Sequence, residues 1–132
     1  SFNKPSLNQG GALVHVYSDG SIRLNHGGTE MGQGLFIKVA QVVAECFKVP
    51  LEQIHITSTN TAEVPNTSAT AASSGSDLNG MAAFKAAKKI KKRILNFITK
   101  RYSVSPKNIN FKNKRIFKKQ PIFSEILFSI FF

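Results

Sequence analysis

The chain has 132 residues, and its 42% hydrophobic content, with 11 phenylalanines, is enough for the core of one ordinary domain. A single cysteine excludes an intrachain disulfide, and no run of about eighteen apolar residues is present. Residues 1–5 lack the pattern of a signal peptide, so we expect a soluble cytoplasmic protein. The net charge of +11 arises from −2 in residues 1–80 and +13 in residues 81–132, so only the second half carries the charge that a polyanion-binding surface needs.

The first half of the sequence predicts a hairpin, a glycine-rich loop, a helix and a short strand. Apolar residues dominate at 12–17 and again at 22–24, with turn residues between them, as in two strands joined by a tight turn. The glycine-rich stretch 27–34 opens onto apolar residues at helical spacing from 35 to 46. Residues 54–57 have the composition of a strand.

A long polar loop precedes the second predicted helix. Residues 58–80 are rich in Ser, Thr, Asn, Ala and Gly, and a loop of this length is uncommon in a compact domain unless it has a function. The helix starts between 73 and 77 and runs to about 100, with Phe84, Ala87, Ile90, Ile94 and Ile98 on one stripe.

The end of the chain predicts a basic hairpin from 108–111 and 115–118, followed by a short terminal helix that Ser124 caps. The fold class is therefore α+β, with a hairpin and short strands packed on two long helices. Because the chain begins at Ser and ends on an apolar run, we expect it to be a piece of a longer protein.

Two loops, at 27–34 and 70–80, each lead into the start of a helix. Helix N-termini offer unpaired amide donors that favour anionic groups, and small residues let a ligand approach the backbone. Gln33 adds an amide, and short hydroxyls are added by Thr70, Ser73, Ser74 and Ser76. The pattern predicts a bound anionic cofactor, while a purely structural glycine-rich turn remains the alternative.

The residue order in these loops resembles one known family. Residues 27–35, Gly-Gly-Thr-Glu-Met-Gly-Gln-Gly-Leu, closely resemble a stretch of the large molybdenum-binding subunit of xanthine dehydrogenases and aldehyde oxidases. Residues 61–80 contain Val-Pro-Asn-Thr-Ser, Thr-Ala-Ala-Ser and Asp-Leu-Asn-Gly in the order and approximate spacing of that family. The resemblance implies a partial molybdenum-cofactor-binding domain of the bacterial xanthine dehydrogenase type, with cofactor loops at 10–80 and a basic helix, hairpin and short terminal helix at 81–132.

The resemblance also assigns roles to individual residues. It implies cofactor contacts for seven of them, namely Met31, Gly32, Gln33, Thr70, Ala72, Ser73 and Ser76. Ala71 and Ala72 would line the substrate pocket, with Ala72 near the molybdenum, because a larger side chain would fill the place where substrate and metal meet. Gly75 is a departure, since the family often has Ser there.

The catalytic base of the family is missing from these residues. In the family a downstream glutamate in a Gly-x-Gly-Glu setting is the general base, whereas Glu125 is the only acidic residue after position 80 and lies in the predicted terminal helix. We therefore expect no catalytic residue here and no activity of the chain alone. The implied parent is an oxidoreductase that hydroxylates hypoxanthine or xanthine at a molybdenum–molybdopterin centre.

The implied partners are the rest of the molybdenum-binding subunit, an FAD/iron–sulfur subunit with 2Fe–2S centres, and the purine, in a hetero-oligomer. Two alternatives stay open. One is a truncated relic whose basic half binds nucleic acid or another polyanion, although a solvated helix face or a contact with an acidic subunit is the preferred interpretation of that half. The other is a related hydroxylase of aldehydes or N-heterocycles.

The other residues with chemical potential have plainer interpretations. His15, His26 and His55 have no metal-ligand spacing and are interpreted as structural or surface residues. Cys46 lies on the apolar side of its helix and is expected to be buried and inert. Glu30 is interpreted as a contact to backbone amides rather than as a general base.

Overall fold

The structure is a computed structural model. It describes residues 8–60, 62–64, 67–70, 74–112, 115–118 and 126–128.

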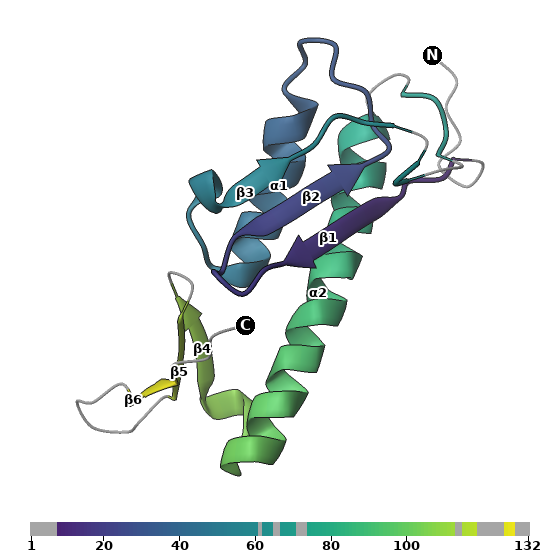
Figure 1. Cartoon of the computed structure of the whole chain (residues 1–132). Coiled ribbons are helices and arrows are strands. Elements are labelled where there is room, and N and C mark those ends of the chain that lie inside the picture. The colour runs from purple at the N-terminus through teal and green to yellow at the C-terminus, as the bar shows by residue number, and fades with distance from the viewer. Residues whose placement is uncertain are drawn as a thin grey trace.

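A three-stranded sheet forms the first layer of the fold (Figure 1). Strands β1 (Ala12–Val16) and β2 (Ile22–His26) pair antiparallel, which confirms the predicted hairpin. Strand β3 (Ile54–Ile56) was also predicted, and it joins the other edge of β2 in parallel. A parallel pair needs a crossover connection, and the intervening chain supplies one that contains a helix.

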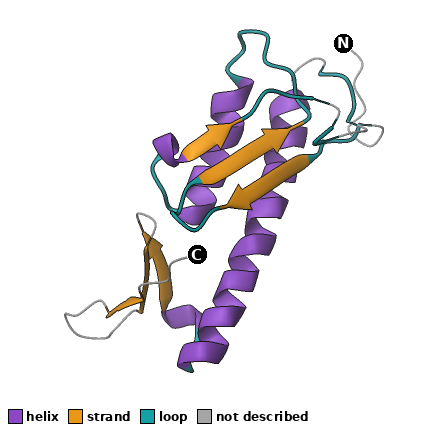
Figure 2. Cartoon of the chain, in the orientation of Figure 1, coloured by secondary structure: helices purple, strands orange, loops and turns teal. Residues whose placement is uncertain are grey.

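Two helices cover one face of this sheet (Figure 2). They are α1 (Leu35–Phe47), which ends at a left-handed Lys48, and the long α2 (Ser74–Tyr102), and both agree with the predicted helices. A 3-10 turn at Leu51–Gln53 follows α1. In the part of the chain that the structure describes, no helix combines the length and apolar character needed to cross a membrane.

The main core lies between the sheet and the two helices. Alternate residues of β2 point toward the helices, so Ile22 and Leu24 are 2% and 0% exposed. They pack with residues of α1 and α2 that include Leu35, Val39, Val43, Ala83 and Ala87. The hydrophobic periodicity of both segments therefore faces this core.

A second sheet packs near the far end of α2, beyond the 3-10 turn at Pro106–Asn108 (Figure 1). Strands β4 (Ile109–Lys112) and β5 (Arg115–Lys118) form the predicted basic hairpin. Its own small core consists of Ile98, Val104, Ile109 and Ile116.

The predicted terminal helix is wrong over the part of it that the structure describes. Residues 126–128 form strand β6 (Ile126–Phe128), which pairs antiparallel with β5. A short apolar run fits a helix or a strand equally well from its sequence, and here the free edge of β5 decides between them. The expected cap, Ser124, and Glu125 lie outside the described residues.

Gly80 is a position where the long helix is expected to gain stability. It is buried inside α2, yet an added Cβ would lie 3.9 Å from Val42 Cγ2, which is an ordinary contact. Because alanine loses less backbone entropy than glycine on forming a helix, Gly80→Ala should raise the free energy of unfolding by about 0.5–1 kcal/mol. Urea denaturation followed by circular dichroism tests this, and a loss of stability would contradict the absence of a close contact at this position.

Candidate functional site

The glycine-rich loop that leads into α1 is ordered by two of its own side chains. The carboxylate of Glu30 accepts hydrogen bonds from the N–H groups of Gly32, Gly34 and Phe36 at 2.9–3.0 Å. The side chain of Gln33 accepts from the N–H of Met31 and donates to the carbonyl of Thr29 at 2.8 Å. These hydrogen bonds within the loop fix its shape.

The amide of Phe36, in the first turn of α1, is bonded to Glu30 and is therefore not open to an anionic ligand as expected. The backbone N–H of Phe36, followed by those of Gly34, Gly32 and Leu35, lowers the pKa of the Glu30 carboxyl below its ordinary value of 4.5. The interpretation of Glu30 as an amide contact is thus confirmed. The positive end of this helix is already compensated by a charge of the protein itself.

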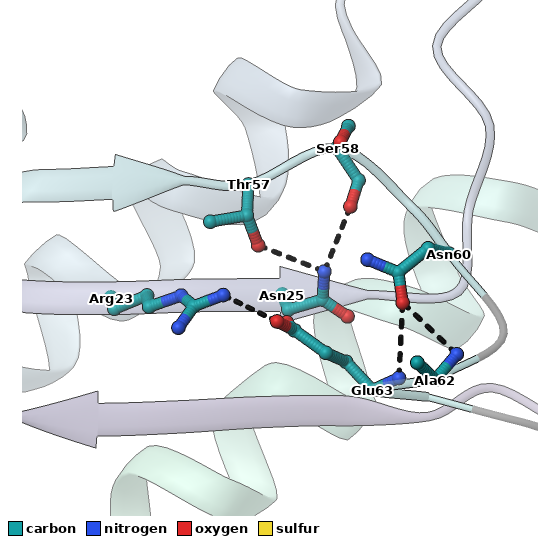
Figure 3. Close-up of polar contacts among 7 residues, drawn as sticks. All are labelled: Arg23, Asn25, Thr57, Ser58, Asn60, Ala62 and Glu63. Carbon is teal, nitrogen blue, oxygen red and sulfur yellow. Dashed lines mark hydrogen bonds and ion pairs between the residues drawn. The ribbon is translucent and has the colours of Figure 1, made fainter.

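The start of the polar loop after β3 is fixed by contacts to β2 (Figure 3). The amide of Asn25 donates to Thr57 Oγ1 at 2.9 Å and to the carbonyl of Ser58 at 3.0 Å. Arg23 forms an ion pair with Glu63. Asn25 is only 1% exposed because this loop folds back over the face of the sheet away from the helices.

The two loops singled out in the sequence lie side by side. The N–H of Thr29 donates to Thr70 Oγ1 at 2.7 Å, which joins positions 41 residues apart. The hydroxyl of Thr59 reaches the carbonyls of Gly28 and His26 at 2.7 and 3.1 Å. The Thr70 contact brings the two loops together, and Thr59 ties the start of the polar segment 58–80 to the same place.

A pocket of about 460 Å³ opens where the loops meet the starts of α1 and α2. Its lining contains four of the predicted site residues, Met31, Gln33, Thr70 and Ser76, together with Leu35, Lys38 and Gly75. The volume lies within the range of about 300–1,000 Å³ that is typical of small-molecule sites.

The remaining predicted site residues are not in this lining. Gly32 is exposed in the first loop, with a left-handed φ of 94°, and does not line the pocket. Ala71, Ala72 and Ser73 lie outside the described residues.

Lys38 is the pocket residue that sequence reasoning missed. Its backbone N–H bonds to the carbonyl of Gly34, so it lies one helical turn beyond the glycine-rich loop. The sequence could have indicated Lys38, because it lies four residues after Gly34, and residues one turn apart share a helix face. The side chain of Lys38 adds a positive charge to the pocket wall.

Gly75, where the sequence departs from the family pattern, has space for a side chain. An added Cβ would lie 3.5 Å from Thr70 Cγ2 and 3.9 Å from Leu35 Cδ2, both ordinary contacts. A serine would therefore fit there, and glycine leaves the pocket wall bare.

The other candidates have structural settings. His15 and His55 are exposed on β1 and β3, and among the described residues no three His, Cys, Asp or Glu side chains gather to hold a metal ion. Cys46 is half-buried rather than fully buried, and desolvation raises the pKa of its thiol against the opposing effect of Lys91 and Lys88. Low thiolate content agrees with the expectation of an unreactive cysteine.

Buried His26 is expected to make stability depend on pH. Burial lowers the pKa of His26 below its ordinary 6.5, although Glu30 raises it slightly, and Nδ1 accepts the N–H of Gly28 at 3.1 Å. The unfolded chain therefore binds a proton more readily, so this contribution is complete above about pH 6.5 and is lost as the pH falls toward the lowered pKa.

Urea denaturation at pH 7.5 and pH 5.5 measures this effect, since the Glu30 carboxyl stays ionised throughout that interval. His26→Gln keeps a side-chain acceptor without the titration, so its stability should change less between the two pH values. An equal loss in both proteins would show that His26 is not the cause.

A family model described as "Molybdopterin cofactor-binding domain" matches residues 1–129. The chain belongs to this family. The resemblance drawn from the two loops is confirmed, as is the α+β class of the molybdopterin-binding domain.

Sequence relatives of this molybdopterin cofactor-binding domain are xanthine dehydrogenases. It is 56% identical over 101 residues to a "Xanthine dehydrogenase/oxidase" of Rattus norvegicus. The aligned residues cover 76% of this chain and 8% of that protein. It is 61% identical over 94 residues to a "Xanthine dehydrogenase" of Blastobotrys adeninivorans, covering 71% of this chain and 7% of that protein. The chain thus spans less than a tenth of the length of these relatives.

Solved structures share the fold. Reconstituted CO dehydrogenase from Oligotropha carboxidovorans superposes with a TM-score of 0.74 at 24% identity, over 84% of this chain and 14% of that one. Quinoline 2-oxidoreductase from Pseudomonas putida 86 has the same TM-score and coverage at 19% identity. At these identities the likeness concerns the fold of the molybdopterin cofactor-binding domain alone.

Proposed function

We propose that the chain forms one wall of the molybdopterin site in a xanthine dehydrogenase-like molybdenum hydroxylase. The observation that carries the proposal is the pocket in which Met31 and Gln33 of the first loop meet Thr70 and Ser76 of the second. The parent reaction is the oxidative hydroxylation of a purine such as hypoxanthine or xanthine. Bound molybdopterin supplies the redox chemistry of that reaction.

The side chains of the pocket suit a pterin that carries a phosphate. The Gln33 amide and the Thr70 and Ser76 hydroxyls supply donors and acceptors for the edge of a heterocycle, and Lys38 supplies a cation for a phosphate. The exposed thioether of Met31, 68% accessible, offers a polarizable apolar contact. The described residues therefore fit the cofactor of the family.

The chain itself would bind and orient, and the proton-transfer residues would lie elsewhere in the parent. In this proposal residues 10–80 carry the cofactor loops, and residues 81–132 support them. The family pattern further assigns Ala71 and Ala72 to the substrate pocket, with Ala72 near the metal, and Gly32 and Ser73 to the cofactor. FAD, 2Fe–2S centres and a partner subunit would complete a hetero-oligomer in the cytoplasm.

Sequencing the coding DNA on both sides of these residues tests whether the chain belongs to a complete molybdenum hydroxylase. An in-frame continuation with an upstream glycine-rich segment and a downstream Gly-x-Gly-Glu supports the proposal. Stop codons at both borders would overturn it and leave a relic.

Pterin content tests the pocket directly. The full-length parent protein is produced in a host that makes the cofactor. The pterin is then released, oxidised and measured by its fluorescence. Because bonds to charged groups contribute about 1.5–3 kcal/mol, Lys38→Ala should weaken pterin retention about tenfold or more. Lys85→Ala, at an exposed position of α2 outside the pocket, is the matched control. Equal retention by both variants would remove Lys38 from the site.

A further inference from the structure

A second hollow lies between α1 and α2 and shares no lining residue with the candidate cofactor pocket. Its volume is about 730 Å³, and it is lined by Val42, Glu45, Cys46, Lys48, Phe84, Lys88, Lys91, Lys92 and Leu95. The floor is apolar, formed by Val42 and Cys46 from α1 and by Phe84 and Leu95 from α2. We call this feature the interhelical groove.

The α2 side of the groove has the spacing of a helix-packing seam. Met81, Phe84, Lys88, Lys91 and Leu95 follow one another at intervals of three and four residues, which places them along one line of the helix. Met81 and Phe84 are 53% and 37% exposed, so large apolar side chains on this line still face solvent. A groove with such a line accepts an amphipathic helix whose apolar residues recur at the same intervals.

The groove is built rigidly by one of its lysines. Lys91 Nζ donates to the carbonyl of Cys46 at 2.7 Å and lies 4.7 Å from the centre of the Phe111 ring. It therefore joins α1, α2 and β4. These contacts of Lys91 help to hold α1 and α2 at the spacing that forms the groove.

The remaining charges of the rim are positive. Lys48 is paired with Glu45, whereas Lys88 and Lys92 are exposed and, among the described residues, take part in no ion pair. The aliphatic stem of such a lysine can cover an apolar partner while its ammonium group reaches the partner's flank. The complementary surface is therefore an apolar face bordered by carboxylates.

We propose that the interhelical groove is a docking site for an amphipathic helix that carries carboxylates along the borders of its apolar face. Charge complementarity favours this occupant over a second copy, because residues 81–132 of each copy carry +13 and would repel one another. The relatives also have ample sequence to supply such a helix, since the chain spans only 8% of the rat protein.

The test uses the isotope-labelled chain and a synthetic helical peptide with leucines on one face and glutamates on both flanks. Backbone NMR signals of Val42, Cys46, Phe84 and Leu95 should shift and saturate as the peptide is added. The double variant Lys88→Glu/Lys92→Glu should bind about tenfold more weakly or worse, because it places like charges on both sides of the contact.

A matched control separates the groove from the overall charge. Lys85→Glu/Lys89→Glu makes the same charge change on the same helix at exposed positions outside the groove, so its affinity should fall less than about threefold. Circular dichroism shows that each variant is folded.

Three results would overturn the proposal: no saturable shift, equal binding of a peptide with lysines in place of the glutamates, or equal weakening by both double variants. If sedimentation showed a dimer of the chain, and dimer formation shifted the same NMR signals, the groove would be assigned to a second copy instead. None of these outcomes bears on the cofactor pocket, whose test is pterin retention.

Discussion

Leu35→Ala is expected to lower the free energy of unfolding by about 2–5 kcal/mol. Leu35 is the first residue of α1, is 1% exposed, and belongs both to the main core and to the lining of the candidate cofactor pocket. The shorter side chain removes apolar contacts and leaves a cavity. Only a shift of the glycine-rich loop 27–34 could fill that cavity. Urea denaturation of the chain and its variant measures the loss.

Ile37→Ala is the matched control, since Ile37 lies in the same helix and is 58% exposed. Its effect should stay within about 0.5 kcal/mol, as is usual for surface substitutions. Similar losses in the two variants would mean that Leu35 is less well packed than its burial indicates. In the parent protein, Leu35→Ala should also reduce pterin retention, because it widens the pocket wall.

Gly28→Val is the second change with a large expected effect, about 2–4 kcal/mol of lost stability. A Cβ at this position would lie 2.6 Å from Leu35 Cδ2 and 2.7 Å from Asn79 Nδ2. Asn79 is buried, and its Nδ2 donates to the carbonyl of Gly75 at 2.8 Å. The added side chain therefore displaces either Leu35 from the core or Asn79 from its hydrogen bond to Gly75.

Gly75→Ala provides the comparison, because its added Cβ makes only ordinary contacts beside the same pocket. It should be neutral or raise stability by up to about 1 kcal/mol. Thermal unfolding of both variants gives the order of stability. If Gly28→Val were as stable as Gly75→Ala, the close approach of the glycine-rich loop to α1 and α2 at Gly28 would be wrong.

The candidate site depended on both levels of information. The two loops and the residues Met31, Gln33, Thr70 and Ser76 were identified from local residue order, and the pocket brings these four together. The contact of Glu30 with backbone amides was also predicted from the sequence, and the structure shows which amides it binds. The participation of Lys38 was not predicted, because it depends on where the side chains of α1 point relative to the two loops.

The sequence by itself determined the hairpin, both long helices and the family, because hydrophobic period, turn residues and residue order are local properties of the chain. Only the tertiary structure decided that β3 runs parallel to β2, that residues 126–128 form a strand, and that an apolar groove with a basic rim remains between the helices. These features rest on contacts between distant residues, such as the pairing of Ile22 with Ile54 and the hydrogen bond of Lys91 to Cys46. Local propensity is too weak to specify such contacts, and long-range packing overrides it.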